Sequence, residues 1–293
     1  MSRGVWLEVA LNGPWGQRLQ PGIPVTAAEI VDQALACIDT GATIVHFHAY
    51  DPDTGRQRDT YELYAPIIER IRNARPQAIV YPTIPIAGGP DAREPLTGAQ
   101  RYEAVEKLAD AGLLEWAVVD PGSVNLAGYR ELRHGKFGFT YANPPDHVLY
   151  GLKLCARSRL VPSYAIYEPG FMRYGAAMRL AVPGAPQPVY RLMFSDEMAF
   201  GLPPEEYALE AYLTLLAQEA SGAAWMVAGL GVDIAPLVGP AVREGGHVRV
   251  GLEDAPLACT KSNAALVQEA VVEIEAAGGY LASGDDVRLD TVR

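Results

Sequence analysis

Short apolar runs rich in β-branched and aromatic residues recur at regular intervals along the chain. They predict strands at residues 5–11, 43–50, 78–84, 115–120, 162–168, 188–194, 223–229 and 247–252. Most of the intervals carry a helical pattern. The first interval places Thr26 and Glu29 at the spacing of a capping box, with Gly41 where the helix would end. Alternating strands and helices predict βα units and a parallel sheet.

Eight such strands are the number that closes a (β/α)8 TIM barrel, and a chain of 293 residues fits one barrel. We therefore expect a single barrel domain over residues 1–293, with 280–293 as a C-terminal cap or subunit contact. The alternative is a doubly wound open sheet, which would carry a glycine-rich phosphate loop after the first strand. That position reads LNGPWGQ and lacks the GxGxxG spacing, so the barrel is favoured.

Side chains alternate across a strand, so each predicted strand divides into a face toward the helices and a face toward the barrel interior. Barrel interiors are usually filled by branched apolar residues. Here the inner faces carry Glu8, His46, His48, Arg191 and Arg249 instead. Burying that many ionisable groups is costly unless they pair with each other or bind a ligand.

The two histidines of the run TIVHFHAY suggest a metal site. Two residues along a strand advance about 6.6 Å on one face, which lets His46 and His48 converge on one ion. Glu253 follows the last strand, which neighbours the first in a closed barrel. Two histidines and one carboxylate with an open position are typical of catalytic zinc, although another divalent metal fits too. The alternative is a pair of core histidines bonded to Glu8 and Tyr50.

Composition narrows the function. Hydrophobic residues make up 49% and charged residues 20%, so disorder is not expected. The net charge of −11 argues against broad binding to nucleic acid or anionic membranes, but a few local arginines can still serve an anionic substrate. The chain shows neither a signal-peptide pattern nor an apolar run of the ~20 residues that span a bilayer, which predicts a soluble cytoplasmic protein. The three scattered cysteines are expected to be reduced.

Several motifs resemble the family of β-keto acid cleavage enzymes, which includes 3-keto-5-aminohexanoate cleavage enzyme, over nearly the whole chain. The motifs are ALNG (10–13), GATIVHFHAYDPDTG (41–55), PSYAIYEPG (162–170), AWMVAGLG (224–231) and GGHVRVGLED (245–254). The resemblance implies a zinc-dependent barrel that reacts a β-keto acid with acetyl-CoA to give acetoacetate and a new acyl-CoA. It also implies His46, His48 and Glu253 as zinc ligands, and Arg249 and Asp254 as catalytic residues.

The sequence allows more than one role for Arg249. The family's proposed base role would need a strongly lowered pKa, which arginine resists, so the residues themselves favour an electrostatic role for it. A plain ion pair with Asp254 at the barrel mouth is the remaining alternative.

The substrate positions depart from the family pattern. Pro82 stands where a serine is expected, Val118 and Asp120 replace threonine and asparagine, Val232 replaces an arginine, and Trp15 lies near an amine-binding glutamate position. These departures indicate a less cationic, bulkier β-keto acid than 3-keto-5-aminohexanoate. We expect the substrate to contact Glu8, Asn12, Trp15, Thr83, Val118, Asp120, Arg191 and Val232.

Two other classes compete with this hypothesis. A metal-dependent hydrolase of the amidohydrolase kind would need histidines at the ends of the fifth and sixth strands, where YAIYE and RLMFS have none. The second competing class is a metal-binding barrel without catalytic activity. The CoA site is poorly marked: Arg56, Arg58 and Lys261 could meet its phosphates or lie in solvated loops. The resemblance implies a homo-oligomer, with a tetramer as the expected assembly.

Overall fold

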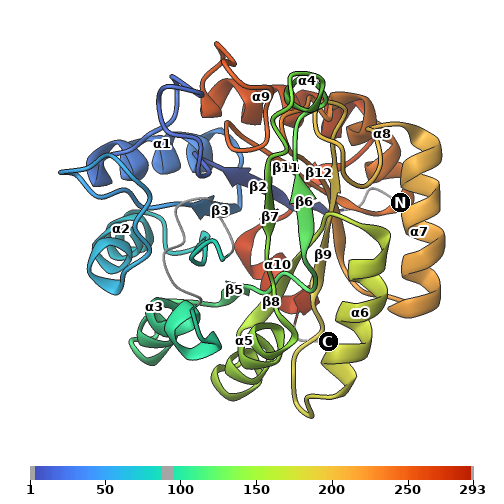
Figure 1. Cartoon of the computed structure of the whole chain (residues 1–293). Helices are drawn as coiled ribbons and strands as arrows, with labels where there is room; N and C mark the ends of the chain where they lie inside the picture. The colour runs from blue at the N-terminus through green and yellow to red at the C-terminus, as the bar shows by residue number, and fades with distance from the viewer. Residues whose placement is uncertain (1–3, 88–95, 292–293) are drawn as a thin grey trace.

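A ring of parallel strands forms the centre of the computed structural model, which describes residues 4–87 and 96–291 (Figure 1). The described sheet contains eight strands: β2 (Leu7–Ala10), β3 (Ile44–Phe47), β4 (Ile79–Pro82), β5 (Trp116–Val118), β8 (Val161–Ile166), β9 (Val189–Phe194), β10 (Trp225–Gly229) and β11 (His247–Val250). They pair in the order β4-β3-β2-β11-β10-β9-β8-β5, and β4 contacts β5 where the order closes. The predicted (β/α)8 barrel is confirmed.

Each of these strands is followed by a helix on the outside of the ring (Figure 1). The helices are α1 (Ala27–Thr40), α2 (Tyr61–Ala74), α3 (Gly98–Asp110), α5 (Pro145–Ser158), α6 (Pro169–Leu180), α7 (Glu206–Glu219), α8 (Ala235–Glu244) and α9 (Asn263–Ala276). None of the described helices has the length and apolar character needed to cross a bilayer.

The first helix begins and ends where the sequence predicted. The Thr26 hydroxyl accepts a hydrogen bond from the Glu29 amide at 3.2 Å, and the Glu29 carboxylate accepts one from the Thr26 amide at 2.9 Å. Gly41, with φ 131°, ends the helix and donates to the carbonyl of Cys37. This capping box fixes the helix start and thereby the length of the loop that follows β2.

Strand register places the ionisable residues inside the barrel. Glu8 of β2 lies opposite Arg249 of β11, and Ala10 of β2 lies opposite His46 of β3. Glu8, His46, Arg191 and Arg249 are all buried. The alternation along the strands had assigned these side chains to the inner face, and the structure has them there.

A hairpin that the strand pattern did not predict is inserted between β5 and α5. Its antiparallel strands are β6 (Val124–Leu126) and β7 (Phe139–Tyr141), joined through the short helix α4 (Tyr129–Arg133). In Figure 1 this hairpin carries α4 at its far end. It was missed because strands this short carry too little alternation to detect.

The C-terminal segment lies under the start of the barrel strands. β12 (Tyr280–Leu281) pairs with β1 (Gly4–Val5), and α10 (Gly284–Thr291) follows. Arg288 of α10 donates to Glu115, just before β5, at 2.6 and 2.9 Å. The expectation of one domain with a cap or subunit contact stays a prediction. Residues 1–3, 88–95, 292 and 293 of that domain lie outside the described residues.

Candidate metal centre and substrate cavity

His46, His48 and Glu253 converge at the C-terminal mouth of the barrel. One potential ligand atom from each side chain lies within 4.8 Å of the others, and no second group of this kind occurs among the described residues. His46 Nε2 lies 3.7 Å from Glu253 Oε2, and His48 Nε2 lies 3.5 Å from Glu253 Oε1. All three side chains are buried. The three residues expected to form one site are therefore together.

Arg249 lies behind this cluster and joins three carboxylates. Its Nη2 is 2.9 Å from Glu253 Oε1 and 2.8 Å from Asp254 Oδ1, its Nε is 2.9 Å from Asp254 Oδ2, and its Nη1 is 3.0 Å from Glu8 Oε1. One guanidinium thus contacts three carboxyl groups, so the carboxyl groups outnumber the positive charge that contacts them. A divalent cation between the histidines and Glu253 would add positive charge beside them.

The pKa values respond to this crowding. Burial lowers the pKa of Arg249, but Asp254, Glu253 and Glu8 outweigh burial and hold it well above its ordinary value. Burial, together with the positive charge of Arg249, holds the pKa of His46 well below its usual range. Burial raises the pKa of Asp254 to about 6 against the opposing charge of Arg249. Arg249 therefore stays protonated, and His46 presents the neutral imidazole that metals bind.

The pKa values of His48 and Glu253 shift in the direction opposite to the one that burial alone would give. Burial lowers the pKa of His48, but the neighbouring Glu253 raises it to a net increase. Burial raises the pKa of Glu253, but Arg249 and the two histidines bring it well below its usual range. Glu253 therefore stays ionised, which is the form in which a carboxylate binds a metal.

The donor set fits a metal ion. His46 Nδ1, His48 Nε2 and Glu253 Oε2 are buried and make no hydrogen bond with any other described residue. Buried polar atoms without partners are rare in folded proteins, so the unpaired His48 Nε2 and Glu253 Oε2, within a cluster whose ligand atoms converge, fit a bound metal ion. The alternative pairing of the histidines with Glu8 and Tyr50 does not occur: Glu8 binds Arg249 and Tyr81, and Tyr50 donates to the Gly13 carbonyl.

Local backbone contacts set the positions of the three ligands. Asn12, at the end of β2, accepts from the His48 amide at 2.8 Å and donates to the His48 carbonyl at 2.9 Å. Gly251 has φ 140°, and an added Cβ would lie 2.1 Å from the Ala10 carbonyl oxygen. Only glycine therefore lets the chain turn there, and the turn brings the Glu253 amide to the same carbonyl at 3.2 Å.

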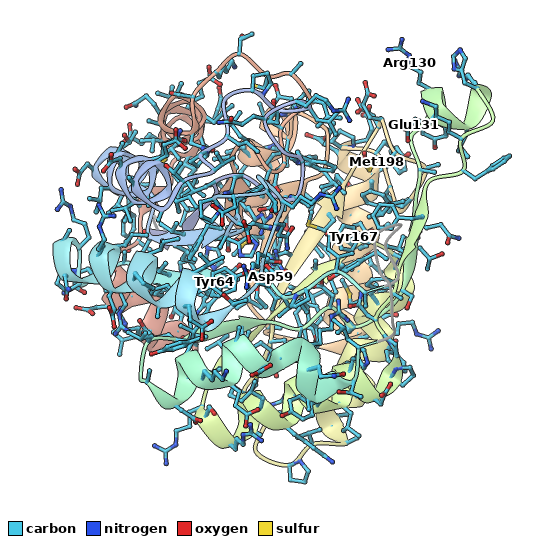
Figure 2. All side chains as sticks on the ribbon, turned by 60° about the vertical axis from the view of Figure 1, so that its left-hand side comes forward. Asp59, Tyr64, Arg130, Glu131, Tyr167 and Met198 are labelled. Carbon is cyan, nitrogen blue, oxygen red and sulfur yellow. The ribbon has the colours of Figure 1, made fainter. Side chains whose placement is uncertain are left out.

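A set of residues behind the metal ligands, which was not predicted from the sequence, orients His48. Gln57 Oε1 lies 2.9 Å from His48 Nδ1, and Gln57 Nε2 donates to both oxygens of Asp59 at 2.9 Å. Asp59 also accepts from the Tyr64 hydroxyl (Figure 2). Because the Asp59 carboxylate takes the amide NH2, the Gln57 oxygen faces His48 and accepts its Nδ1–H. That leaves His48 Nε2 as the nitrogen turned toward Glu253, an arrangement common around metal-bound histidines.

A cavity of about 610 Å³ opens above the cluster. Of the residues expected to contact substrate, five line it: Trp15, Thr83, Val118, Asp120 and Arg191. Three others are not among the described lining residues, namely Glu8, Asn12 and Val232. Glu8 and Asn12 instead support Arg249 and His48. Tyr141, at the end of β7, and Tyr167, directly after β8, also line the cavity and were not singled out from the sequence.

Asp120 and Arg191 form a second buried pair in this cavity. Arg191 Nη2 lies 3.7 Å from Asp120 Oδ1, and Asp120 also accepts from the Tyr141 hydroxyl at 2.7 Å and the Ala165 amide at 3.0 Å. Arg191 is 3% exposed, and its Nε makes no hydrogen bond with another described residue. Asp120 is thus well satisfied, whereas Arg191 is not.

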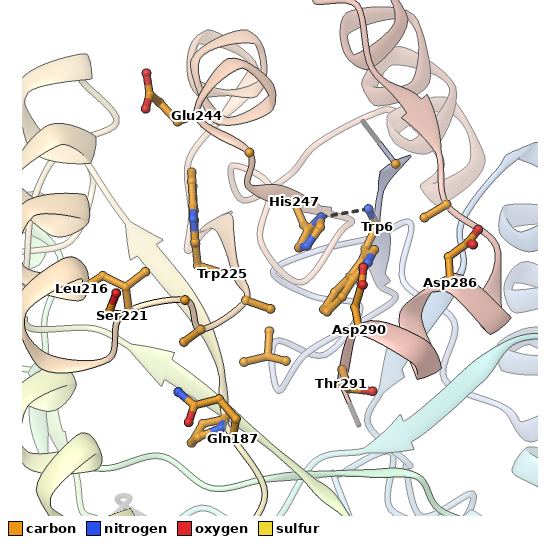
Figure 3. A pocket seen from close by; sticks show the side chains of 18 of the residues that line it. Trp6, Gln187, Leu216, Ser221, Trp225, Glu244, His247, Asp286, Asp290 and Thr291 are labelled. Atoms are coloured by element: carbon orange, nitrogen blue, oxygen red, sulfur yellow. Dashed lines mark hydrogen bonds between the residues drawn. The ribbon is translucent and has the colours of Figure 1, made fainter. Parts of the chain in front are cut away.

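A second cavity, of about 720 Å³, lies at the opposite end of the barrel (Figure 3). There His247 stacks on Trp6 with ring centroids 3.9 Å apart and accepts a hydrogen bond from the Trp6 amide at 3.1 Å. Trp225 and Asp290 also line this space. Active sites of such barrels lie at the C-terminal face, so the cavity above the histidines is the candidate active site.

Fold and site together define a (β/α)8 barrel with a buried cluster of two histidines and a carboxylate at its catalytic face. The chain belongs to the beta-keto acid cleavage enzyme family, which it matches over residues 4–289.

Curated relatives cover nearly the full chain. The chain is 27% identical to the 3-keto-5-aminohexanoate cleavage enzyme of Fusobacterium nucleatum, covering 92% of this chain and 90% of that protein. It is 26% identical to the 3-oxoadipate:acetyl-CoA acetyltransferase of Cupriavidus necator, covering 97% and 93%. Among solved structures, a binary complex of ObcA with oxaloacetate matches with a TM-score of 0.72 at 16% identity, covering 93% of this chain and 67% of that one. This last likeness supports the fold alone.

Removing one histidine of the cluster should strongly weaken metal binding. We expect His46→Ala to weaken equilibrium zinc binding by more than roughly a hundredfold, because loss of a direct ligand exceeds the 10–100-fold typical of outer partners. Isothermal titration calorimetry on chelator-treated protein measures this. His147→Ala is the control, since His147 is buried in α5 outside the cluster. Full metal content in a His46→Ala/His48→Ala protein would show that the ligand assignment is wrong.

Disturbing the residues behind the metal ligands should have a smaller effect. Gln57→Leu removes the acceptor of the His48 Nδ1–H, and we expect zinc affinity to fall about 10–100-fold with the fold intact. Competition with a chromogenic chelator gives the affinity, and circular dichroism checks the fold. Gln17→Leu, which removes an exposed amide donating to the Ile23 carbonyl, serves as the matched control. Equal affinities of the two variants would exclude an orienting role for Gln57.

Proposed function

We propose that this protein is a zinc-dependent acyltransferase that cleaves a β-keto acid with acetyl-CoA. In the overall reaction the bond between C2 and C3 of the keto acid breaks, and C2 forms a bond to the acetyl carbonyl carbon, giving acetoacetate. The released acyl group takes the CoA thiolate and leaves as acyl-CoA. The observation that carries this proposal is the cluster of His46, His48 and Glu253 beside Arg191 in one cavity, in a chain of this family.

His46, His48 and Glu253 would hold the metal. Zinc, when bound there, supplies a Lewis acid that polarises a carbonyl oxygen. Arg249 contributes a permanent positive charge beneath the cluster, because its three carboxylate partners keep its pKa well above the ordinary value. This favours the electrostatic role over the base role for Arg249, and Asp254 serves to position it at 2.8 and 2.9 Å.

Arg191 is suited to hold the substrate carboxylate. It lines the cavity and keeps a buried Nε without a hydrogen bond in the described structure. Its contacts with Asp120 at 3.7 Å and with the Ser163 carbonyl at 3.5 Å are long. A carboxylate that accepts two hydrogen bonds from a guanidinium is a strong and geometrically specific partner. Arg191 therefore gains more from a bound carboxylate than it loses.

The acyl chain of the substrate is expected to be uncharged and apolar. Much of the cavity wall is apolar, formed by Ile84, Ile86, Val118, Leu126, Phe139, Met198, Leu230 and Leu257. The Trp15 indole Nε1 donates to the Glu253 carbonyl at 2.7 Å, so its ring adds a further apolar wall. Asp120 already accepts hydrogen bonds from Tyr141 and Ala165, and Glu253 is assigned to the metal, so neither of these buried carboxylates of the described wall is free to bind a substrate amine.

The competing functions fit less well. An amidohydrolase would present histidines at the ends of β8 and β9, and these ends lead into Tyr167 and Ser195. A metal-binding barrel without activity would have no use for the unsatisfied Arg191 in the cavity. Assembly into a homo-oligomer stays a prediction.

A screen of β-keto acids tests the function. With zinc-loaded protein and acetyl-CoA, we expect acetoacetate and acyl-CoA in equal amounts, with straight-chain or aromatic β-keto acids preferred over 3-keto-5-aminohexanoate by at least tenfold in kcat/KM. A single missing apolar contact changes kcat/KM by 10–200-fold, and burying an unpaired ammonium costs more. Comparable turnover of the amino substrate would contradict the proposed specificity, and no acetoacetate from any keto acid would contradict the activity.

Arg191 can be tested separately. Arg191→Met should lower kcat/KM for the keto acid on the order of a hundredfold or more, because a buried charge partner is lost, and leave the KM for acetyl-CoA within about twofold. Arg191→Lys keeps the charge without the planar fork and should fall in between. Thermal unfolding checks that both variants fold. An unchanged KM for the keto acid in Arg191→Met would remove the carboxylate role.

A further inference from the structure

The end of the inserted hairpin is a basic surface in an acidic protein. We call residues 129–138, which include α4, the basic tip; all of them are exposed. The basic tip carries Arg130, Arg133 and Lys136 and one carboxylate, Glu131, which gives it a formal charge of +2 in a chain whose net charge is −11. We propose that the basic tip binds the phosphate groups of the CoA thioester, which rests on the acetyl-CoA dependence proposed above.

The basic tip borders the candidate active site. Arg130 and Phe139 line the same cavity as His46, His48 and Glu253. In Figure 2 Arg130 and Glu131 lie on the part of the hairpin that projects from the barrel. A thioester that extends from the metal cluster to the cavity mouth would therefore bring its other end to this surface.

Backbone contacts hold the hairpin at the mouth. The Tyr129 amide donates to the Glu197 carbonyl at 3.0 Å, and the Ala199 amide donates to the Ala127 carbonyl at 2.9 Å. A β-bridge joins Gly128 to Met198 between these two bonds. The base of the basic tip is thus fixed to the loop after β9, which gives its side chains a defined position relative to the cavity.

The basic side chains of the basic tip have no ion-pair partner in the described structure. None of the ion pairs there includes Arg130, Arg133 or Lys136. The other candidates for the phosphates differ: Arg58 pairs with Asp51 at 2.7 Å, and Lys261 pairs with Glu269 at 2.6 Å. Neither Arg58 nor Lys261 lines the cavity, and Arg56 does not either.

The chemistry of CoA matches this surface. CoA carries a diphosphate and a 3′-phosphate at the adenosine end, and arginine binds phosphate oxygens in pairs. Phe137, 79% exposed, and Tyr129, 51% exposed, offer ring faces for the adenine. Glu131 of the basic tip and Glu197, both exposed, also line the cavity and would repel phosphate groups there. The phosphates would therefore lie at the basic side chains of the cavity mouth and the uncharged thioester within the cavity.

The test reverses three charges. Arg130→Glu/Arg133→Glu/Lys136→Glu should raise the KM for acetyl-CoA roughly ten- to a hundredfold and leave the KM for the keto acid unchanged. With acetyl-pantetheine, which lacks the phosphates, variant and parent should be equal. The matched control is Arg70→Glu/Lys153→Glu/Arg173→Glu, which makes the same charge change on α2, α5 and α6 and should leave both KM values unchanged.

The outcomes separate this inference from the proposed function. An unchanged KM for acetyl-CoA in the triple variant, or an equal rise with acetyl-pantetheine, would overturn the inference even where acetoacetate forms. A rise produced instead by Arg56→Glu/Arg58→Glu would overturn it as well. If no keto acid is turned over, calorimetry with CoA alone still decides: binding that weakens at least tenfold in the triple variant supports the basic tip, and equal binding rejects it.

Discussion

The buried contact between Arg249 and three carboxylates determines the rest of the site. A guanidinium that is 1% exposed would be far too costly to bury alone, so Glu8, Glu253 and Asp254 must stay with it. Their side chains come from β2 and from the turn after β11, two neighbours in the ring. The contact therefore ties the last strand to the first and fixes Glu253 where it faces both histidines.

The same contact favours the binding of a further cation at the site. One guanidinium contacts three carboxyl groups, and one of these, Glu253, also faces His46 and His48. The groups that would share the cation lie on β3, directly after β3 or in the turn after β11, at the ends of barrel strands. The loops and the β6–β7 hairpin form much of the remaining cavity wall, so chemistry and specificity lie on different parts of the fold.

Much of this arrangement follows from strand periodicity. Alternation along the strands assigns Glu8, His46, Arg191 and Arg249 to the interior, and ring closure brings Glu253 to the histidines, because both rules depend only on regular geometry. Gln57 could not be found this way. Its contact with His48 depends on the irregular loop after β3, including the bridge between Tyr50 and Gln57, which no sequence period encodes.

The residues expected to contact the substrate also differ in position. Thr83, Val118 and Asp120 follow or end barrel strands and line the cavity, whereas Val232 is buried beside the turn after β10 and is not among the described lining residues. One residue of offset at a strand end changes the face that a side chain reaches, so positions beyond a strand are less certain than positions within it.

The two buried arginines of the barrel differ in how tightly they are held, and this difference assigns their roles. Arg249 contacts its carboxylates at 2.8–3.0 Å and has every guanidinium nitrogen engaged. Exchanging any of these partners for a substrate would leave a buried carboxylate unpaired. Arg191 contacts Asp120 at 3.7 Å, and Asp120 keeps two other hydrogen bonds if that contact is lost. In the proposed reaction a substrate carboxylate can therefore approach Arg191 while Asp120 keeps its hydrogen bonds, and Arg249 remains a fixed part of the protein.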